Sequence, residues 1–426
     1  MLSQLSPNIV MNRIKIFSHS FILTSLIAML LVATVVPFLG TIGYALLMSL
    51  IILFGLTRHI EVLKSKPFHY MTLFIFIEFF YSIFGQGIGF TMIIFHSLYY
   101  FVAIIICFNL EKLSSKQISF LLYLILGLFT FTFVVTFYAL MTDPMAIRQY
   151  AYGGEDALSD SPQAFGVYSY GFGEALAIIL PTLMAFVLST KNILLKLLCF
   201  LVVAGGLITQ LLASLTTSVL LSFVFCSMVV LSGLLSIQNK LYRIVLFIII
   251  GLFVVIIVRS ISLDDNLTFL VKMEDVSQSY STGESVGQVE DRSSLYVQSI
   301  KVCIRNPILG LGECPDEFGT YNENTVSLHT TIFDFWGFYG LFLIWFIVSW
   351  KKTIEKTYSL LCKGTKKYYK WTFFSLFSLL LLKGPVTIGL NFLFSTVLFG
   401  IVCMAAYHRQ PQLINKNVQK CSDMGR

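Results

Sequence analysis

Long uncharged apolar runs follow one another along most of this chain, and they limit what it can fold into. Each run holds about 20 mostly apolar residues, which is the length that lets a helix cross a bilayer. Only 12% of the 426 residues are charged and 57% are hydrophobic, whereas a soluble domain carries roughly 25% charged residues. This polar surface is too small to cover a water-soluble globule, so we expect an integral membrane protein.

The runs predict an all-α fold, a polytopic membrane helical bundle of about 12 transmembrane helices. They are continuous rather than alternating, which favours helices over the strands of a barrel. No small-residue cleavage pattern accompanies the first run, so we expect a retained span and not a signal peptide. The expected spans are roughly 18–38, 41–57, 68–85, 90–108, 118–141, 171–189, 193–212, 215–235, 241–259, 328–350, 371–387 and 389–407.

The basic residues predict the orientation, because cytoplasmic segments of membrane proteins carry an excess of Lys and Arg. With the N-terminus in the cytoplasm, 22 of the 29 Lys and Arg residues fall on the cytoplasmic side, and most carboxylates fall outside. We therefore expect a multi-pass protein of the cell (inner) membrane with both termini cytoplasmic. Topology also explains the net charge of +7, so nucleic acid is not an expected partner.

Two of the segments between spans are long, and both are expected outside. The predicted organisation is spans one to nine in 1–259 with an outer loop at 142–170, a large extracytoplasmic loop at 260–327, spans ten to twelve in 328–407, and a basic cytoplasmic tail at 408–426. The large loop is the largest polar stretch of the chain, so we expect it to carry the function. The eight cysteines form no close pair of the kind that binds zinc, and no metal or other cofactor is expected.

The second half of the large loop contains the most informative stretch, RSSLYVQSIKVCIRNPILGLG. Apolar residues from Leu295 to Ile304 predict a short amphipathic helix, which Asn306-Pro307 ends. Gly310 and Gly312 predict a turn whose backbone can approach a ligand closely. His329 follows at the outer mouth of the tenth span.

This stretch and the LHTTIFDFWGFYG that follows it resemble the O-antigen polymerase and ligase superfamily (Wzy- and WaaL-type). That family shows an Arg, a helix ending in Pro-x-x-Gly-x-Gly, and a His eleven residues before a Gly. The matching positions are Arg292, Pro307, Gly310, Gly312, His329 and Gly340. The chain departs from the pattern at Thr330, which follows the His, at Leu343, and at Thr216-Thr217, where the family often has an Arg in a middle span.

The resemblance implies a metal-independent glycosyltransferase that polymerises undecaprenyl-diphosphate-linked oligosaccharide repeat units of O-antigen, capsule or another exopolysaccharide on the extracytoplasmic face. It assigns Arg292 to the diphosphate, which a guanidinium binds with paired hydrogen bonds. It assigns His329 the role of base for the attacking sugar hydroxyl. The expected partners are the lipid-linked oligosaccharide, the bilayer, a chain-length regulator and a flippase.

Further substrate-binding candidates are polar residues near the outer face: Arg148, Glu174, Arg259, Lys301, Arg305, Gly310, Gly312, Asp334 and Lys383. Arg148, Arg259 or Lys383 is a candidate for the diphosphate contact that the missing family Arg leaves open. Three of the set have structural alternatives: a hydrogen bond into the bundle for Asp334, a buried hydrogen bond to a Tyr for Glu174, and snorkelling to the surface for Lys383. Glu78 and His96 lie at equal depth on either side of a hairpin, and we expect them to pair.

Two rival functions stay open. An O-antigen ligase would use the same donor but transfer the glycan to lipid A core. A lipid-linked glycan flippase or transporter belongs to another class, and it should carry charged residues through both halves of the bundle. The sparse charge within the spans counts against transport.

Overall fold

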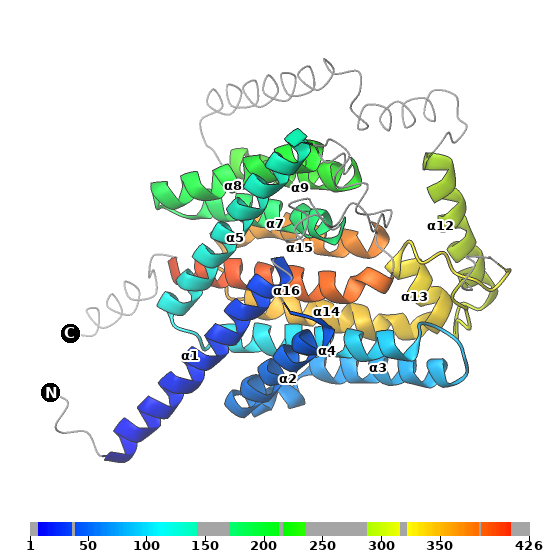
Figure 1. The fold of residues 1–426 in the computed structure, drawn as a ribbon, viewed down its shortest axis with the longest axis horizontal. Coiled ribbons are helices and arrows are strands. Elements are labelled where there is room, and N and C mark those ends of the chain that lie inside the picture. The colour runs from blue at the N-terminus through cyan, green and yellow to red at the C-terminus, as the bar shows by residue number, and fades with distance from the viewer. Residues whose placement is uncertain are drawn as a thin grey trace, which may run out of the picture.

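A computed structural model gives the structure of residues 7–35, 39–142, 170–212, 216–235, 288–315, 322–382 and 385–409 (Figure 1). Nearly all of these residues are helical, and they contain no strand longer than an isolated bridge. The helices are α1 (Pro7–Val35), α2 (Thr41–Arg58), η2 (Ile60–Lys64), α3 (Lys66–Ile83), α4 (Phe90–Leu110), α5 (Ser115–Thr142), α7 (Tyr170–Ser189), α8 (Ile193–Leu212), α9 (Thr216–Leu234), α12 (Gln288–Arg305), α13 (Thr331–Tyr339), η5 (Gly340–Phe342), α14 (Leu343–Tyr358), α15 (Lys363–Leu382) and α16 (Pro385–Arg409).

The helices confirm the predicted fold class. Eleven of the twelve expected spans coincide with a helix or a broken helix, and the span expected at 241–259 lies outside the described residues. Six helices of the described part are long and apolar enough to cross a membrane. The protein is therefore a helical, multi-pass membrane protein.

The tenth span is broken, where a continuous helix over 328–350 was expected. Helix α13 ends at Gly340, whose φ of +56° lies in the left-handed region, and this region favours glycine because it has no Cβ. The Leu341 amide then bonds to the Ile308 carbonyl oxygen at 3.0 Å instead of continuing the helix. The chain resumes as α14, which continues to Tyr358.

Helix α16 lies at the centre of the bundle and packs against α4, α5, α7 and α14 (Figure 1). A group of buried aromatic rings joins α4, α14 and α16 through Tyr100, Phe346, Trp350 and Phe392. The Trp350 indole also donates to the Thr396 hydroxyl at 2.9 Å. Lipid tails are as apolar as these side chains, so close packing and hydrogen bonds are what hold the helices together.

Glu78 of α3 and His96 of α4 face each other inside the bundle, which confirms the expected pair. Their Oε1 and Nδ1 atoms are 3.8 Å apart, and both side chains are almost fully buried. Gly389 of α16 leaves space for the His96 ring, because a Cβ there would lie 2.8 Å from His96 Cδ2. An ionisable residue within a membrane is costly when unpaired, so each group stabilises the other and ties α3 to α4.

Helix α12 lies crosswise at one end of the bundle, against α13 (Figure 1). It contains the amphipathic helix that the apolar spacing predicted, and it ends at Arg305, directly before Asn306-Pro307. The residues between α14 and α15, which include Cys362, follow the far end of the broken span. The α12 end and the Cys362 end are therefore separated by one crossing of the bundle.

We predict that the α12 end faces outward and the Cys362 end inward. Cys362 is exposed, and its pKa is lowered chiefly by a hydrogen bond from the Thr365 hydroxyl, so it reacts readily wherever a maleimide reaches it. Cys314 is a poor outer probe, because burial and the charge of Asp334 raise its pKa to about 11. An Asn324→Cys substitution places an exposed thiol at the α12 end instead.

The measurement uses an impermeant maleimide on intact cells, with any outer membrane permeabilised. The labelling variant combines Asn324→Cys with Cys362→Ser and Cys421→Ser, and the comparison protein keeps Cys362 and carries only Cys421→Ser. We expect label at position 324 in intact cells and at Cys362 only after the membrane is disrupted. The reverse pattern would invert the topology.

Candidate active site

The Pro-x-x-Gly-x-Gly turn packs backbone to backbone on the end of α13. The amides of Leu311 and Gly312 donate to the carbonyl oxygens of Phe338 and Gly337, at 3.1 and 2.9 Å. In the other direction, the Leu341 amide donates to the turn. These bonds join the two halves of the predicted motif.

Glycines make this contact possible. A Cβ added to Gly310, whose φ is +84°, would lie 2.5 Å from the Phe338 carbonyl group, and one added to Gly312 would lie 2.8 Å from the Gly337 oxygen. A Cβ on Gly340 would collide with the Ile308 carbonyl. Gly310 and Gly312 were expected to let a ligand approach closely. The structure shows that α13 itself makes the close approach on the side where their Cβ atoms would be.

The tip of the α3–α4 hairpin joins the same assembly. The Gly87 amide donates to the Gly312 oxygen at 3.3 Å, and the Cys314 thiol donates to the Gly87 oxygen at 3.2 Å. Glu313 forms isolated bridges both to Gly87 and to Thr325. Three segments far apart in sequence thus lie side by side at the α12 end of the bundle.

Asp334 connects α12, α13 and the segment that enters α13. Its Oδ1 atom lies 2.5 Å from the Ser299 hydroxyl and 3.3 Å from the Ser327 hydroxyl, and its Oδ2 accepts from the Thr330 amide at 2.8 Å. The side chain is fully buried, so these bonds replace the water that a carboxylate otherwise needs. This arrangement agrees with the structural alternative for Asp334, a hydrogen bond into the bundle.

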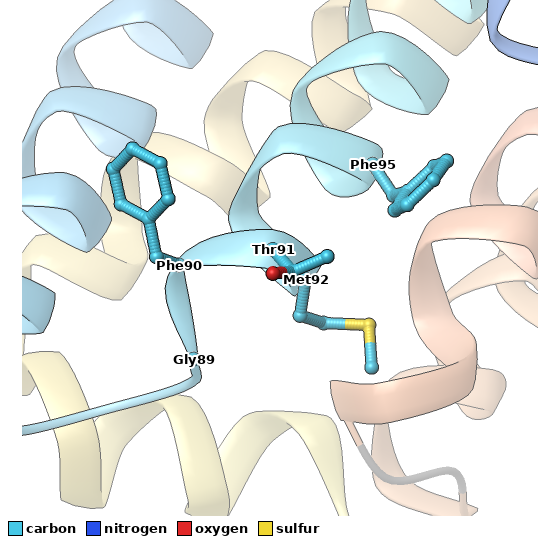
Figure 2. A pocket seen from close by; sticks show the side chains of 5 residues that line it. All are labelled: Gly89, Phe90, Thr91, Met92 and Phe95. Atoms are coloured by element: carbon cyan, nitrogen blue, oxygen red, sulfur yellow. The ribbon is translucent and has the colours of Figure 1, made fainter. Parts of the chain in front are cut away.

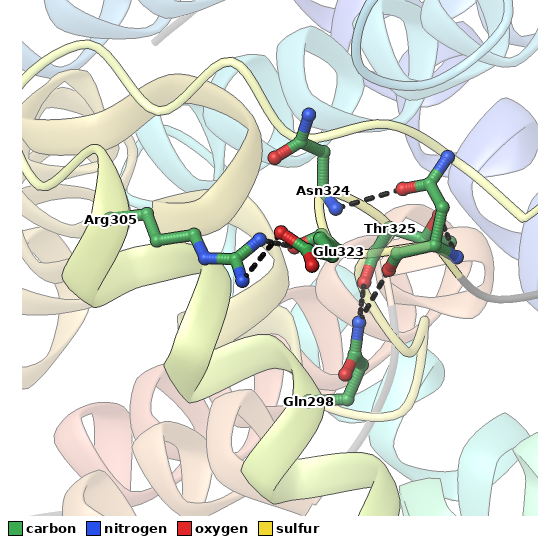
Figure 3. A network of polar contacts seen from close by, with 6 residues as sticks. Gln298, Arg305, Glu323, Asn324 and Thr325 are labelled. Carbon is green, nitrogen blue, oxygen red and sulfur yellow. Dashed lines mark hydrogen bonds and ion pairs between the residues drawn. The ribbon is translucent and has the colours of Figure 1, made fainter.

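A second polar network binds the segment around Thr325 to the exposed side of α12 (Figure 3). The Gln298 amide donates to the carbonyl oxygens of Asn322 and Thr325, at 2.8 and 3.0 Å. The Arg305 guanidinium forms an ion pair with the Glu323 carboxylate at 2.8 Å and donates to the Glu323 carbonyl at 2.7 Å. Arg305, predicted to bind substrate, therefore holds this segment on α12.

His329 lies at the entrance to α13 with its side chain exposed. Its amide donates to the Ser327 hydroxyl at 3.3 Å, and Leu328 before it has a φ of +60°. In the described part of the chain, Leu328 and Leu311 are the two non-glycine residues with positive φ. Such a conformation costs on the order of 1–3 kcal/mol and occurs most often at functional sites. Both residues belong to the predicted motif.

The other predicted residues are placed less fully. Arg292 is the fifth residue of α12 and Glu174 the fifth residue of α7, but their side chains are outside the described part. Arg148, Arg259 and Lys383 lie outside the described residues altogether. Lys301 is exposed on α12. The structure thus brings His329, Asp334 and the two glycines into one assembly, and leaves the proposed diphosphate ligands as predictions.

The two thiols of this assembly are protonated at neutral pH. The pKa of Cys303 is raised to about 12 and that of Cys314 to about 11. Burial is the main cause of both shifts, and the negative charge of Asp334 adds to it. Cys303 also contacts the Phe333 carbonyl oxygen at 3.1 Å. Among the described residues, no three His, Cys, Asp or Glu side chains come together in a way that would hold a metal ion.

An open surface pocket of about 460 Å³ lies at the start of α4 (Figure 2). Gly89, Phe90, Thr91, Met92 and Phe95 line it, so its wall is mostly apolar. It begins two residues after Gly87, which bonds to the glycine turn. The sequence analysis missed this pocket, and it also missed Ser299 and Ser327. Apolar wall residues and single serines carry no local sequence signal, and only the fold brings them together.

Comparison with known families agrees with this geometry. Residues 201–348 match the Wzy_C family, described as O-antigen ligase. The matched range contains α9, α12, the glycine turn, His329 and α13, so this part of the chain is similar to that family. Searches of curated proteins and of solved structures gave no match.

We predict that Gly310→Ala and Gly340→Ala each destabilise the protein by at least about 1–3 kcal/mol, because an added methyl group must push apart two backbones at a positive φ. Gly364→Ala is the matched control. Gly364 is exposed in the first turn of α15, with no atom within 4 Å of a new Cβ. Thermal unfolding in detergent measures all three. Equal midpoints for Gly310→Ala and Gly364→Ala would contradict the packing described for the turn.

Proposed function

We propose that this protein polymerises lipid-diphosphate-linked oligosaccharide repeat units on the extracytoplasmic face of the cell membrane. The family match indicates a ligase- or polymerase-type glycosyltransferase. The single observation that carries the proposal is the placement of His329. An exposed imidazole follows a strained residue, and the buried Asp334 network and the glycine turn of the family motif hold its segment. Preorganisation of this kind is typical of a catalytic group.

In the proposed reaction, a sugar hydroxyl of the acceptor attacks the anomeric carbon of the donor. The bond from that carbon to the lipid diphosphate breaks, and the diphosphate leaves with the electron pair. His329 takes the proton of the attacking hydroxyl, which requires an imidazole that is neutral before the step. Arg292 and further cations at the outer face stabilise the charge on the leaving diphosphate.

A ligase is the second candidate, because the matched family is described as O-antigen ligase. It uses the same donor chemistry, and only the acceptor differs. A flippase has less support. Among the described residues, the fully buried ionisable pair in the spans is Glu78 with His96, and these two groups compensate each other rather than lining a path.

We predict that His329→Ala lowers the rate of polymer formation roughly 10²–10⁴-fold, because this is the usual contribution of a general base. His69→Ala is the matched control, because His69 is exposed in the first turn of α3, at the opposite end of that helix from the hairpin tip. The assay uses purified protein in liposomes with the lipid-linked repeat unit and a chelator.

Each outcome of this assay decides between the candidates. Polymer from the wild type and from His69→Ala, but not from His329→Ala, supports the polymerase. Product only when lipid A core is added would identify a ligase. Movement of the lipid-linked unit across the bilayer without any product would identify a flippase. Full polymer from His329→Ala would remove His329 from the mechanism.

We predict that Arg292→Lys lowers the polymerisation rate about ten- to a hundredfold, the value of one charge-assisted contact of about 1.5–3 kcal/mol. Lysine keeps the charge but loses the forked geometry. Arg292→Ala should lose at least as much activity, while both variants insert and accumulate normally. Full activity of Arg292→Lys would exclude paired contacts to a diphosphate, and full activity of Arg292→Ala would exclude any role for the residue in binding.

A further inference from the structure

Helix α12 exposes a mixed apolar and basic stripe that its role in the site does not use. Its buried side holds Ser299, Val302 and Cys303. The exposed stripe follows helical spacing and continues into the turn. Its members are Val297 (47% exposed), Lys301, Ile304 (73%) and Ile308 (64%), and the paired Arg305 lies beside it. Exposed large apolar side chains suit a helix that lies in a membrane interface, and a long basic side chain among them can extend its charge to the headgroups.

Helix α3 carries a second exposed apolar stripe. Its members also follow helical spacing, and no described element of the bundle covers them. They are Leu73, Phe76, Phe80, Ile83 and Phe84, of which Ile83 is 75% exposed. In a membrane protein, such a stripe contacts lipid acyl chains. It runs to the last turn of α3, at the α12 end of the bundle.

One hydrogen bond connects the two segments that carry these stripes. The Tyr81 hydroxyl of α3 donates to the Leu309 carbonyl oxygen at 2.5 Å, so the turn after α12 sits on the last turn of α3. Ile308 and Leu309 are both at least half exposed there. Helix α12 extends from this point crosswise to the membrane-spanning helices, as an interfacial helix must (Figure 1).

We propose that the side chains of Ile304, Ile308 and Leu309 insert into the lipid leaflet at the α12 end, with α12 lying in the interface and the Arg305–Glu323 pair on its aqueous side. The occupant is the phospholipid bilayer itself. Its acyl chains cover Ile304, Ile308 and Leu309 as a continuation of the α3 stripe. Lys301, one turn before Ile304, meets the anionic headgroups, because a long basic side chain places its charge at that depth while its stem stays apolar.

The immersion has a consequence for the site. It holds the glycine turn at the depth of the lipid headgroups, where the diphosphate of a lipid-linked donor lies. The inference goes beyond the proposed function, since contact with lipid requires no catalytic activity. The experiment therefore measures lipid contact alone. The inference can be wrong while the proposed function is correct.

The experiment places the photo-crosslinker p-benzoylphenylalanine at Ile304, at Ile308 or, as the matched control, at Asn324. Asn324 is exposed at the same end of the bundle but belongs to the polar segment held on α12. Each full-length protein is reconstituted in vesicles of phosphatidylethanolamine and phosphatidylglycerol and irradiated. The mass of the intact protein is then measured by mass spectrometry. Leu309 is the replacement position if a variant at 304 or 308 fails to fold.

We expect adducts with the mass of one phospholipid at positions 304 and 308, and none above the unirradiated background at 324. Equal lipid adducts at 324 and 308 would overturn the proposal, because contact would then not be specific to the stripe. Absence of lipid adducts at 304 and 308 in folded protein would also overturn it. Adducts with a second copy of the chain in place of lipid would reassign the stripe to a protein interface.

Discussion

Everything at the α12 end of this protein depends on one contact between two stretches of backbone. The turn from Pro307 to Gly312 exchanges hydrogen bonds with the end of α13, and peptide groups meet there without side chains between them. Because peptide groups supply both partners, the contact satisfies donors that would otherwise be buried and unpaired. The hairpin tip at Gly87 then adds to the same turn. Loss of this contact would remove the backbone bonds that hold the turn after α12 on α13.

The second requirement is a buried carboxylate that receives enough hydrogen bonds. Asp334 gathers Ser299 from α12, Ser327 from the entering segment and the Thr330 amide at the start of α13. A buried network of this kind stabilises only when it is satisfied. Here it is satisfied by residues on both sides of His329, namely Ser327 and Thr330. These bonds fix the backbone on either side of His329, and so they hold the exposed imidazole in place. Rigid placement and exposure are both needed for a base that must meet an incoming hydroxyl.

Periodicity and spacing predicted the spans, α12 and the pairing of Glu78 with His96, because each depends on local pattern or on equal distance from a turn. The break at Gly340 was not predicted, since a glycine in an apolar run has no signal of its own and the carbonyl that replaces the helical bond comes from Ile308. Asp334 was recognised as a candidate, but its partner Ser299 lies 35 residues away. Gly310 and Gly312 were assigned to a ligand. The glycines indicate from sequence that some group approaches the backbone closely, but the sequence does not indicate that this group is the end of α13.

The central claim is that the glycine turn is bound to α13 through its peptide groups, and hydrogen exchange of the folded wild-type protein in lipid nanodiscs tests it most directly. The amides of Leu311, Gly312 and Leu341 donate to carbonyl oxygens of the facing segment. They should therefore exchange far more slowly than the amide of Glu323, an exposed residue of the neighbouring turn. Exchange of all three at the rate of an unstructured peptide would contradict the account.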